Sequence, residues 1–234
     1  MRLTITQLAR TPHLTALAVL IAAAWSRANQ LPQAPSPTTT FSSAELIYSA
    51  DQAINFEAHA SPRCFDWNGD GALDLIVGDA TGQVWLFINS ARKRSKPKFA
   101  PRQQIAAGSR TQWGKGYTGV VLHDLNNDNL ADLIVAHSNN LVSIHYNIGT
   151  TAEPEFATEC IKVRVQDGCH GRIDMADWDG DGRSDLVTGS FGGELQWHRN
   201  LGSQHSPKFA PAAAFHDIRI AYNAHPRIVD FDRD

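Results

Sequence analysis

Short apolar runs alternate with polar turns containing glycine or asparagine over most of this chain. Three runs, LDLIVGD, ADLIVAH and SDLVTGS, are rich in β-branched residues, and each is followed after a turn by a second run, QVWLFIN, LVSIHYN or ELQWHRN. A further strand is expected before each acidic stretch, as in GRIDMADW, and another in segments such as FATECIKVRV. Runs of this kind predict β-strands, and outside the N-terminus no segment has a convincing helical period. The pattern therefore predicts an all-β fold.

Two motifs recur in the same order along the chain. The acidic motif reads DWNGDGALDLIVGD, DLNNDNLADLIVAH, DWDGDGRSDLVTGS and DFDRD, starting at Asp66, Asp124, Asp177 and Asp230. The second motif reads NSARKRSKPKF, NIGTTAEPEF and NLGSQHSPKF. Counted from the phenylalanine that closes this motif, the repeats span about 41–98, 99–155, 156–208 and 209–234, the last of them truncated. About four strands in roughly fifty residues is typical of a β-propeller blade. We expect an incomplete β-propeller of four-stranded blades, about three blades plus the start of a fourth.

The N-terminus has the pattern of a targeting segment. Two arginines precede an apolar run that ends in small residues, which predicts a secretory signal peptide over residues 1–28. The alternative is a membrane anchor, but the run is short for a bilayer span. Residues 29–40 are rich in Pro and Thr and predict a flexible linker. We therefore expect a secreted, extracellular or cell-surface protein (a periplasmic one is also possible), with no stable membrane insertion after cleavage.

The acidic motif has the spacing of a calcium loop. Oxygen-bearing side chains at positions 1, 3 and 5, a turn residue at position 6, the carbonyl of position 7 and an aspartate at position 9 can surround one hard cation. The apolar strand begins at position 10 and no glutamate stands at position 12, which argues against an EF-hand. Metal-free Asp/Asn/Gly turns remain the alternative. The expected Ca²⁺ ligands are Asp66, Asn68, Asp70, Ala72 and Asp74; Asp124, Asn126, Asp128, Leu130 and Asp132; Asp177, Asp179, Asp181, Arg183 and Asp185; and Asp230, Asp232 and Asp234.

Three details of these loops lead to further expectations. The third copy carries the most acidic charge and should bind best. Asn129 replaces the glycine at position 6 of the second copy, and asparagine tolerates the left-handed backbone region. Position 2 is apolar in every copy (Trp67, Leu125, Trp178 and Phe231), and we expect a buried anchor there in preference to a ligand-stacking face.

These residues resemble the FG-GAP/VCBS repeat family, whose blades also occur in the propeller of integrin α subunits. The resemblance rests on the acidic loop and the NxGxxxxPxF tail, and it covers about residues 41–234. It implies a propeller with calcium in loops between strands, and an adhesive, scaffolding or ligand-binding role outside the cytoplasm. Because a closed ring takes four to eight blades, the chain is expected to be a fragment or truncated product of a longer protein.

No persuasive catalytic motif is present, which favours a binding module without chemistry of its own. The alternative is a propeller-based enzyme, such as a polysaccharide lyase, with catalytic residues beyond this chain. The repeats differ most in residues 106–119, where Arg110, Trp113, Lys115 and Tyr117 could bind a glycan or protein ligand; the alternative is a longer turn with Trp113 packed on the blade.

Net charge and cysteine content bear on the class of partner and on disulfide bonding. The 234 residues carry a formal net charge of −3, which gives no reason to expect nucleic acid as a partner. Of the three cysteines, Cys160 and Cys169 could bridge a local hairpin, or could remain small buried thiols.

Overall fold

The computed structural model describes residues 43–91, 95–114, 116–165, 169, 171–203, 205–219 and 221–229. The expected signal peptide, the linker and the fourth acidic motif (Asp230, Asp232 and Asp234) lie outside the described residues, as does Lys115. The chain divides into two units, Met1–Glu45 and Leu46–Asp234, and nearly all described residues belong to the second.

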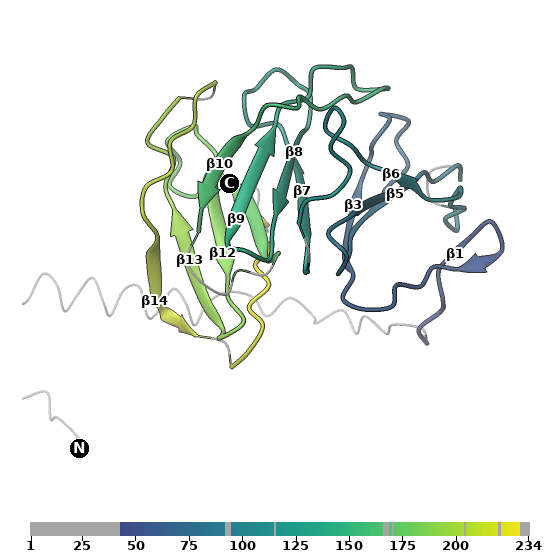
Figure 1. Ribbon diagram of the computed structural model, residues 1–234, viewed down its shortest axis with the longest axis horizontal. Helices are drawn as coiled ribbons and strands as arrows, with labels where there is room; N and C mark the ends of the chain where they lie inside the picture. Colours follow the sequence, from purple (N-terminus) through teal and green to yellow (C-terminus); the bar gives the residue numbers. More distant parts are fainter. Residues whose placement is uncertain are drawn as a thin grey trace, which may run out of the picture. The chain divides into compact units, whose positions relative to one another are not determined.

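The second unit consists of β-strands, and no helix occurs among the described residues (Figure 1). Three four-stranded antiparallel sheets follow one another in the sequence, which confirms the predicted all-β fold built of blade-like sheets. The first sheet contains β3 (Ser61–Phe65), β4 (Asp74–Gly78), β5 (Val84–Phe87) and β6 (Gln103–Gln104). The second contains β7 (Gly119–His123), β8 (Asp132–Ala136), β9 (Leu141–His145) and β10 (Ile161–Arg164). The third contains β11 (Ile173–Ala176), β12 (Asp185–Gly189), β13 (Glu194–His198) and β14 (Ala213–Arg219).

The sheets are out of phase with the sequence repeats counted from phenylalanine. Each sheet begins with the strand before an acidic loop and ends with the strand after the next phenylalanine, so β6 follows Phe99 but pairs with β5. Phe99 and Phe156 lie where consecutive segments join, because each forms one antiparallel bridge to an asparagine of its own sheet and one parallel bridge to a preceding or following segment. A short hairpin, β1 (Tyr48–Ser49) and β2 (Gln52–Ala53), supplies the bridge to Phe99.

The second strand of each sheet is buried along its whole length. All five residues of β4, β8 and β12 are buried, which explains why these segments are apolar in succession and do not alternate with polar residues. One hydrophobic cluster joins the first sheet to the second, with Ile76 packed in the same cluster as Leu133. Another joins the second to the third, with Ile134 in the same cluster as Leu186. Packing between successive sheets therefore forms the core.

The first strands of the sheets approach one another closely. β7 contacts both β3 and β11. A Cβ atom added to Gly119 would lie 1.7 Å from the carbonyl oxygen of Gly171, so only glycine fits where β7 meets the segment before β11. The first strands of the three sheets therefore lie next to one another, with β7 in contact with the other two.

The cysteines are free thiols, so the alternative of a bridge between Cys160 and Cys169 is not formed. Cys169 is buried, and burial raises the pKa of its thiol to about 11. It therefore stays protonated and packs as a small apolar side chain.

The second and third sheets contain buried histidines whose ring nitrogens are hydrogen-bonded. His145 on β9 donates from Nδ1 to the carbonyl of Ala157 at 2.8 Å, and its Nε2 lies 3.2 Å from the Ser143 hydroxyl. The same hydroxyl lies 2.9 Å from His137 Nε2. Burial lowers the pKa of His137, His145 and His198, so these rings are neutral in the folded protein.

These histidines predict a loss of stability in mild acid. The unfolded chain takes up a proton near pH 6.5, whereas the folded chain resists it, so stability is constant above that pH and falls below it by up to about 1.4 kcal/mol per pH unit for each histidine. His145→Phe, which installs the residue found at the equivalent position of the first sheet, should flatten this dependence in urea unfolding measured between neutral pH and pH 5. The exposed His205→Phe should leave it unchanged, and an equal effect of both variants would contradict the assignment.

Candidate metal-binding loops

The three acidic loops share one backbone conformation. Positions 4 and 6 have positive φ in every copy: Gly69 and Gly71 (72° and 84°), Asn127 and Asn129 (58° and 68°), and Gly180 and Gly182 (73° and 83°). Asparagine thus adopts in the second copy the left-handed conformation that glycine adopts in the others, as its sequence position predicted.

Side-chain to backbone hydrogen bonds hold this conformation. The position 1 carboxylate accepts the N–H of position 6, as between Asp66 Oδ2 and Gly71 (2.9 Å) and between Asp177 Oδ2 and Gly182 (2.8 Å). The position 5 carboxylate accepts the N–H of position 7, as between Asp70 and Ala72 (2.8 Å). The same two bonds form in the second copy, from Asn129 to Asp124 and from Leu130 to Asp128. The acids at positions 1 and 5 therefore turn inward over one centre.

Acidic oxygens converge most closely in the third loop. One carboxylate oxygen each from Asp177, Asp179 and Asp181 lies within 4.8 Å of the other two, so these three could hold a metal ion. Two arginines share the group: Arg199 contacts Asp179 at 2.5 Å and Asp181 at 3.1 Å, and Arg183 pairs with Asp181. The third loop, which has the most acidic charge, thus also carries cationic partners that compete for its oxygens.

The first loop contains an unpaired buried oxygen. Asp66 Oδ1 has no accessible surface and no hydrogen-bond partner among the described residues. A carboxylate oxygen in this state is costly unless a cation compensates it. No arginine pairs with the acids of this loop in the described structure, so its charge balance differs from that of the third loop.

The position 9 aspartates have a structural role. Asp74, Asp132 and Asp185 have no exposed surface, and in each both carboxylate oxygens accept an N–H bond. Asp74 accepts from the backbone of Trp67 (2.9 Å) and Asn89 (2.6 Å). Asp132 accepts in the same way from Leu125 (3.0 Å) and Asn147 (2.9 Å), and Asp185 from Asn200 (2.7 Å) and the indole of Trp197 (2.8 Å). A metal contact of these residues, predicted from spacing, remains a prediction.

The asparagine that opens the second sequence motif completes this arrangement. Asn89 accepts the backbone N–H groups of Ala91 and Lys98 on Oδ1 at 3.1 and 2.9 Å, and donates from Nδ2 to the carbonyl of Leu73 at 3.0 Å. Asn147 and Asn200 make the equivalent bonds. The two sequence motifs recur together because the aspartate and the asparagine, fifteen residues apart, clamp the acidic loop to the tail loop.

Burial raises the pKa values of two position 9 aspartates, Asp74 and Asp132. The pKa of Asp74 is raised by burial, against the opposing effect of the N–H groups of Asn89 and Trp67. Burial likewise raises the pKa of Asp132 to about 6, and the charges of Asp128 and Asp124 contribute in the same direction.

The apolar residues at position 2 differ in burial. Leu125 is buried between the second and third sheets, and Trp67 is half-buried with its ring 5.8 Å from that of Phe156. Both agree with the predicted anchor. Trp178 is 47% exposed and packs edge-on against Phe215, so the anchor prediction is wrong for this copy in the described structure. The following sheet covers the first two copies, whereas among the described residues the ring contact of Trp178 is with Phe215 of its own sheet.

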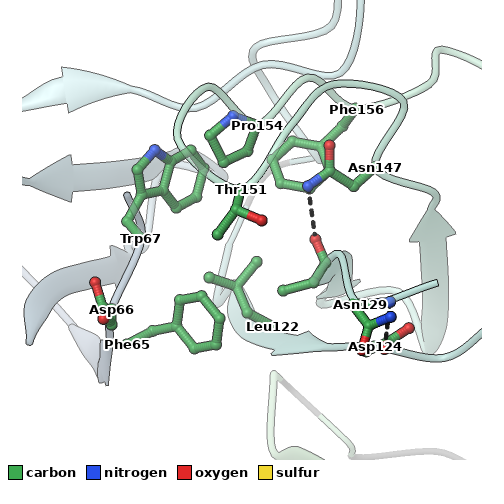
Figure 2. A pocket seen from close by; sticks show the side chains of 11 residues that line it. Phe65, Asp66, Trp67, Leu122, Asp124, Asn129, Asn147, Thr151, Pro154 and Phe156 are labelled. Atoms are coloured by element: carbon green, nitrogen blue, oxygen red, sulfur yellow. Dashed lines mark hydrogen bonds between the residues drawn. The ribbon is translucent and has the colours of Figure 1, made fainter. Parts of the chain in front are cut away.

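A cavity of about 210 Å³ lies between the first two acidic loops (Figure 2). Phe65, Trp67 and Phe156 form much of its apolar lining, and Asp66 and Asp124 border it. The cavity is thus a hollow between neighbouring sheets with loop carboxylates at its edge.

Trp113 is the buried aromatic residue of the predicted ligand-binding segment 106–119, in which several other described residues are exposed. Trp113 is 1% exposed, donates its backbone N–H to Gly82 at 2.7 Å, and its carbonyl contacts His137. It therefore packs on the blade, as the alternative expected, and offers no face to a ligand here. Arg110 and Tyr117 are partly exposed, and the Tyr117 ring stacks edge-on with His59 at 4.1 Å.

The clamp predicts that two neighbouring aspartates have different effects on stability. Asp132→Ala leaves two buried N–H groups unpaired and should lower the free energy of unfolding by about 2–5 kcal/mol in urea titrations with EDTA. Asp128→Ala, in the same loop but exposed, should cost about 1 kcal/mol or less without metal. Equal losses in EDTA would contradict a structural role specific to position 9.

Comparison with known proteins agrees with the repeat assignment. Residues 66–155 match the family model described as FG-GAP-like repeat, a span that contains the first two acidic loops and both of their tail loops. A comparison with curated proteins found no match. Within the part of the chain that the structure describes, no helix has the length and hydrophobicity needed to cross a membrane. The resemblance inferred from the two motifs is thus confirmed over residues 66–155, which are similar to FG-GAP-like repeats.

Proposed function

We propose that this chain is a calcium-stabilised β-propeller-type module that binds a glycan or protein partner outside the cytoplasm and has no catalytic activity of its own. The observation that carries the proposal is the convergence of three carboxylates in the third loop, within 4.8 Å of one another. Carboxylate oxygens are the ligands that a hard divalent cation prefers.

The donor set of the loops fits calcium. In the third loop the oxygens of positions 1, 3 and 5 converge, and the same spacing in the other loops, with the backbone carbonyl of position 7, would supply further oxygen ligands. The buried, unpaired Asp66 Oδ1 would gain a partner if a cation entered the first loop. In the third loop, Asp177, Asp179 and Asp181 would hold the ion, and Arg199 would have to move aside.

An architectural role for the ion follows from where the loops attach. Each loop ends at the buried position 9 aspartate, which anchors the second strand of its sheet and the tail loop. A cation over positions 1 to 5 would neutralise acids that otherwise repel one another at the end of that anchored strand. Calcium would therefore stabilise the end of each sheet from which the acidic loop projects. The surface of the sheets would supply the binding function.

The proposed location rests on the N-terminal sequence. An apolar segment with basic flanks favours export, and calcium is abundant outside the cytoplasm. A slightly negative net charge makes nucleic acid an unsuitable partner.

Calcium should raise the melting temperature of the full chain relative to EDTA. A ligand at about a hundred times its dissociation constant adds about 2.7 kcal/mol of stability. Asp179→Asn should remove part of the increase, because it deletes one charged ligand and leaves the loop's backbone hydrogen bonds to Asp177 and Asp181 in place. Glu194→Gln, an exposed acid on β13, serves as the charge-matched control. An identical melting temperature with calcium and with EDTA would show that the loops are turns.

Removing the competing arginine should strengthen calcium binding at the third loop. In a background in which Asp70→Asn and Asp128→Asn disable the other two loops, Arg199→Gln frees Asp179 and removes one of the two arginine partners of Asp181. Calcium binding should then tighten by about three- to ten-fold in calorimetric titration. Arg164→Gln, an exposed arginine on β10, should have no effect. Unchanged or weaker binding in Arg199→Gln would mean that the arginine does not compete with the ion.

A further inference from the structure

Basic side chains gather near the first strands of the sheets, away from the acidic loops. The relevant positions lie five and three residues before the first acid of each motif, and residues two apart share one face of a strand. β7 adjoins both β3 and β11, so these positions come together where the first strands meet. They are Ser61 and Arg63, Gly119 and Val121, Arg172 and Asp174, and His225 and Arg227.

Arg63 crosses from the first sheet to the other two. Its Nε donates to the carbonyl of Val120 at 3.1 Å, and its Nη2 donates to the carbonyl of Ile173 at 2.5 Å. The same nitrogen lies 3.5 Å from Asp174 Oδ1. The other oxygen of Asp174 accepts the backbone N–H of Ile228 at 2.7 Å. The single acid of this cluster is therefore already engaged on both oxygens.

Arg172 is buried with donors that lack partners. It is 7% exposed, and its Nη2 donates to the Asn223 amide oxygen at 2.5 Å. Its Nε and Nη1 have no accessible surface and no hydrogen-bond partner among the described residues. The Phe191 ring lies 5.8 Å from the guanidinium and accepts no strong hydrogen bond. Unpaired N–H groups on a buried charge are costly, so an acceptor is missing on this side.

Cationic side chains surround His225. Burial lowers the pKa of His225, and the nearby charges of Arg172, Arg227 and Arg63 lower it further. Burial also lowers the pKa of Arg227, against the opposing effect of Asp174. Beside Arg172, the Cys169 thiol is protonated, because burial raises its pKa to about 11. His225 thus lies near three guanidinium groups, of which Arg63 and Arg227 are acted on by the carboxylate of Asp174.

We propose that Arg172, His225 and Arg227 form a binding site for an oxyanion, a carboxylate or a sulfate group, either free or carried by an acidic sugar. His225 and Arg227 are exposed, whereas Arg172 is buried and bonds to Asn223, in the same segment. The Asn223 amide now occupies one corner of the Arg172 guanidinium, and a charged acceptor makes stronger, bidentate bonds to the same group. The incoming anion displaces Asn223 from Nη2 and pairs that nitrogen together with one of the unpaired donors, Nε or Nη1. This site is separate from the calcium loops and opposite in charge.

Calorimetric titration of the full chain tests the site, with sulfate in one arm and galacturonate in the other, each against chloride at equal ionic strength. One anion per chain is expected to bind in at least one arm; sulfate alone indicates a free inorganic anion, and galacturonate indicates a sugar carboxylate. Arg227→Gln should weaken binding about ten-fold or more, because a charge-assisted hydrogen bond is lost. Arg164→Gln, the same change on β10, should not.

Arg172→Lys provides the second variant, because it keeps the charge but loses the planar fork. Arg172→Lys should weaken anion binding and leave the urea midpoint of unfolding close to that of the unmodified chain. If this variant unfolds, the exposed-residue variants Arg227→Gln and His225→Gln provide the test. The proposal would be overturned if neither sulfate nor galacturonate bound more tightly than chloride. Equal affinities in Arg227→Gln and Arg164→Gln would also overturn it.

Discussion

The buried aspartate at position 9 of each acidic loop is the contact on which each sheet depends. It stands at the start of the second strand, which is buried throughout, and each of its two carboxylate oxygens accepts an N–H group. In the first two sheets the donors belong to the acidic loop and to the tail loop, so one carboxylate holds these two loops together. The partner asparagine then satisfies the tail loop. A charge this deeply buried is tolerable only because all its oxygens are bonded.

Packing between neighbouring sheets determines which side chains are buried and which polar groups need partners within the protein. Because neighbouring sheets cover each other, polar groups within them must be paired internally, as His145 is with Ser143 and Ala157. The same covering explains why Leu125 is buried and Trp178 is not. Residues that occupy equivalent repeat positions therefore differ in environment according to the sheet that lies beside them.

Charge is separated along the strands that precede the acidic loops. Acids occupy the loop end, where the third copy gathers three carboxylates, and bases occupy the other end, where Arg63, Arg172 and Arg227 lie. A cation at one end and an anion at the other would each relieve repulsion that the chain alone leaves in place. Both proposed sites thus have the same physical basis, which is a group of like charges that neighbouring side chains compensate only in part.

The sequence alone determined the elements and their order, because strand periodicity, turn chemistry and recurrence are local properties. It identified the strands, the two motifs, the left-handed Asn129 and the resemblance of residues 66–155 to FG-GAP-like repeats. Only the tertiary structure could show that the position 9 aspartates bond to a segment fifteen residues away, or that Trp113 packs in the core while Trp178 is exposed. Only it could bring Arg63 to Asp174, more than a hundred residues apart. Such contacts depend on which sheets adjoin, and spacing within one repeat contains no information about a neighbour that another repeat supplies.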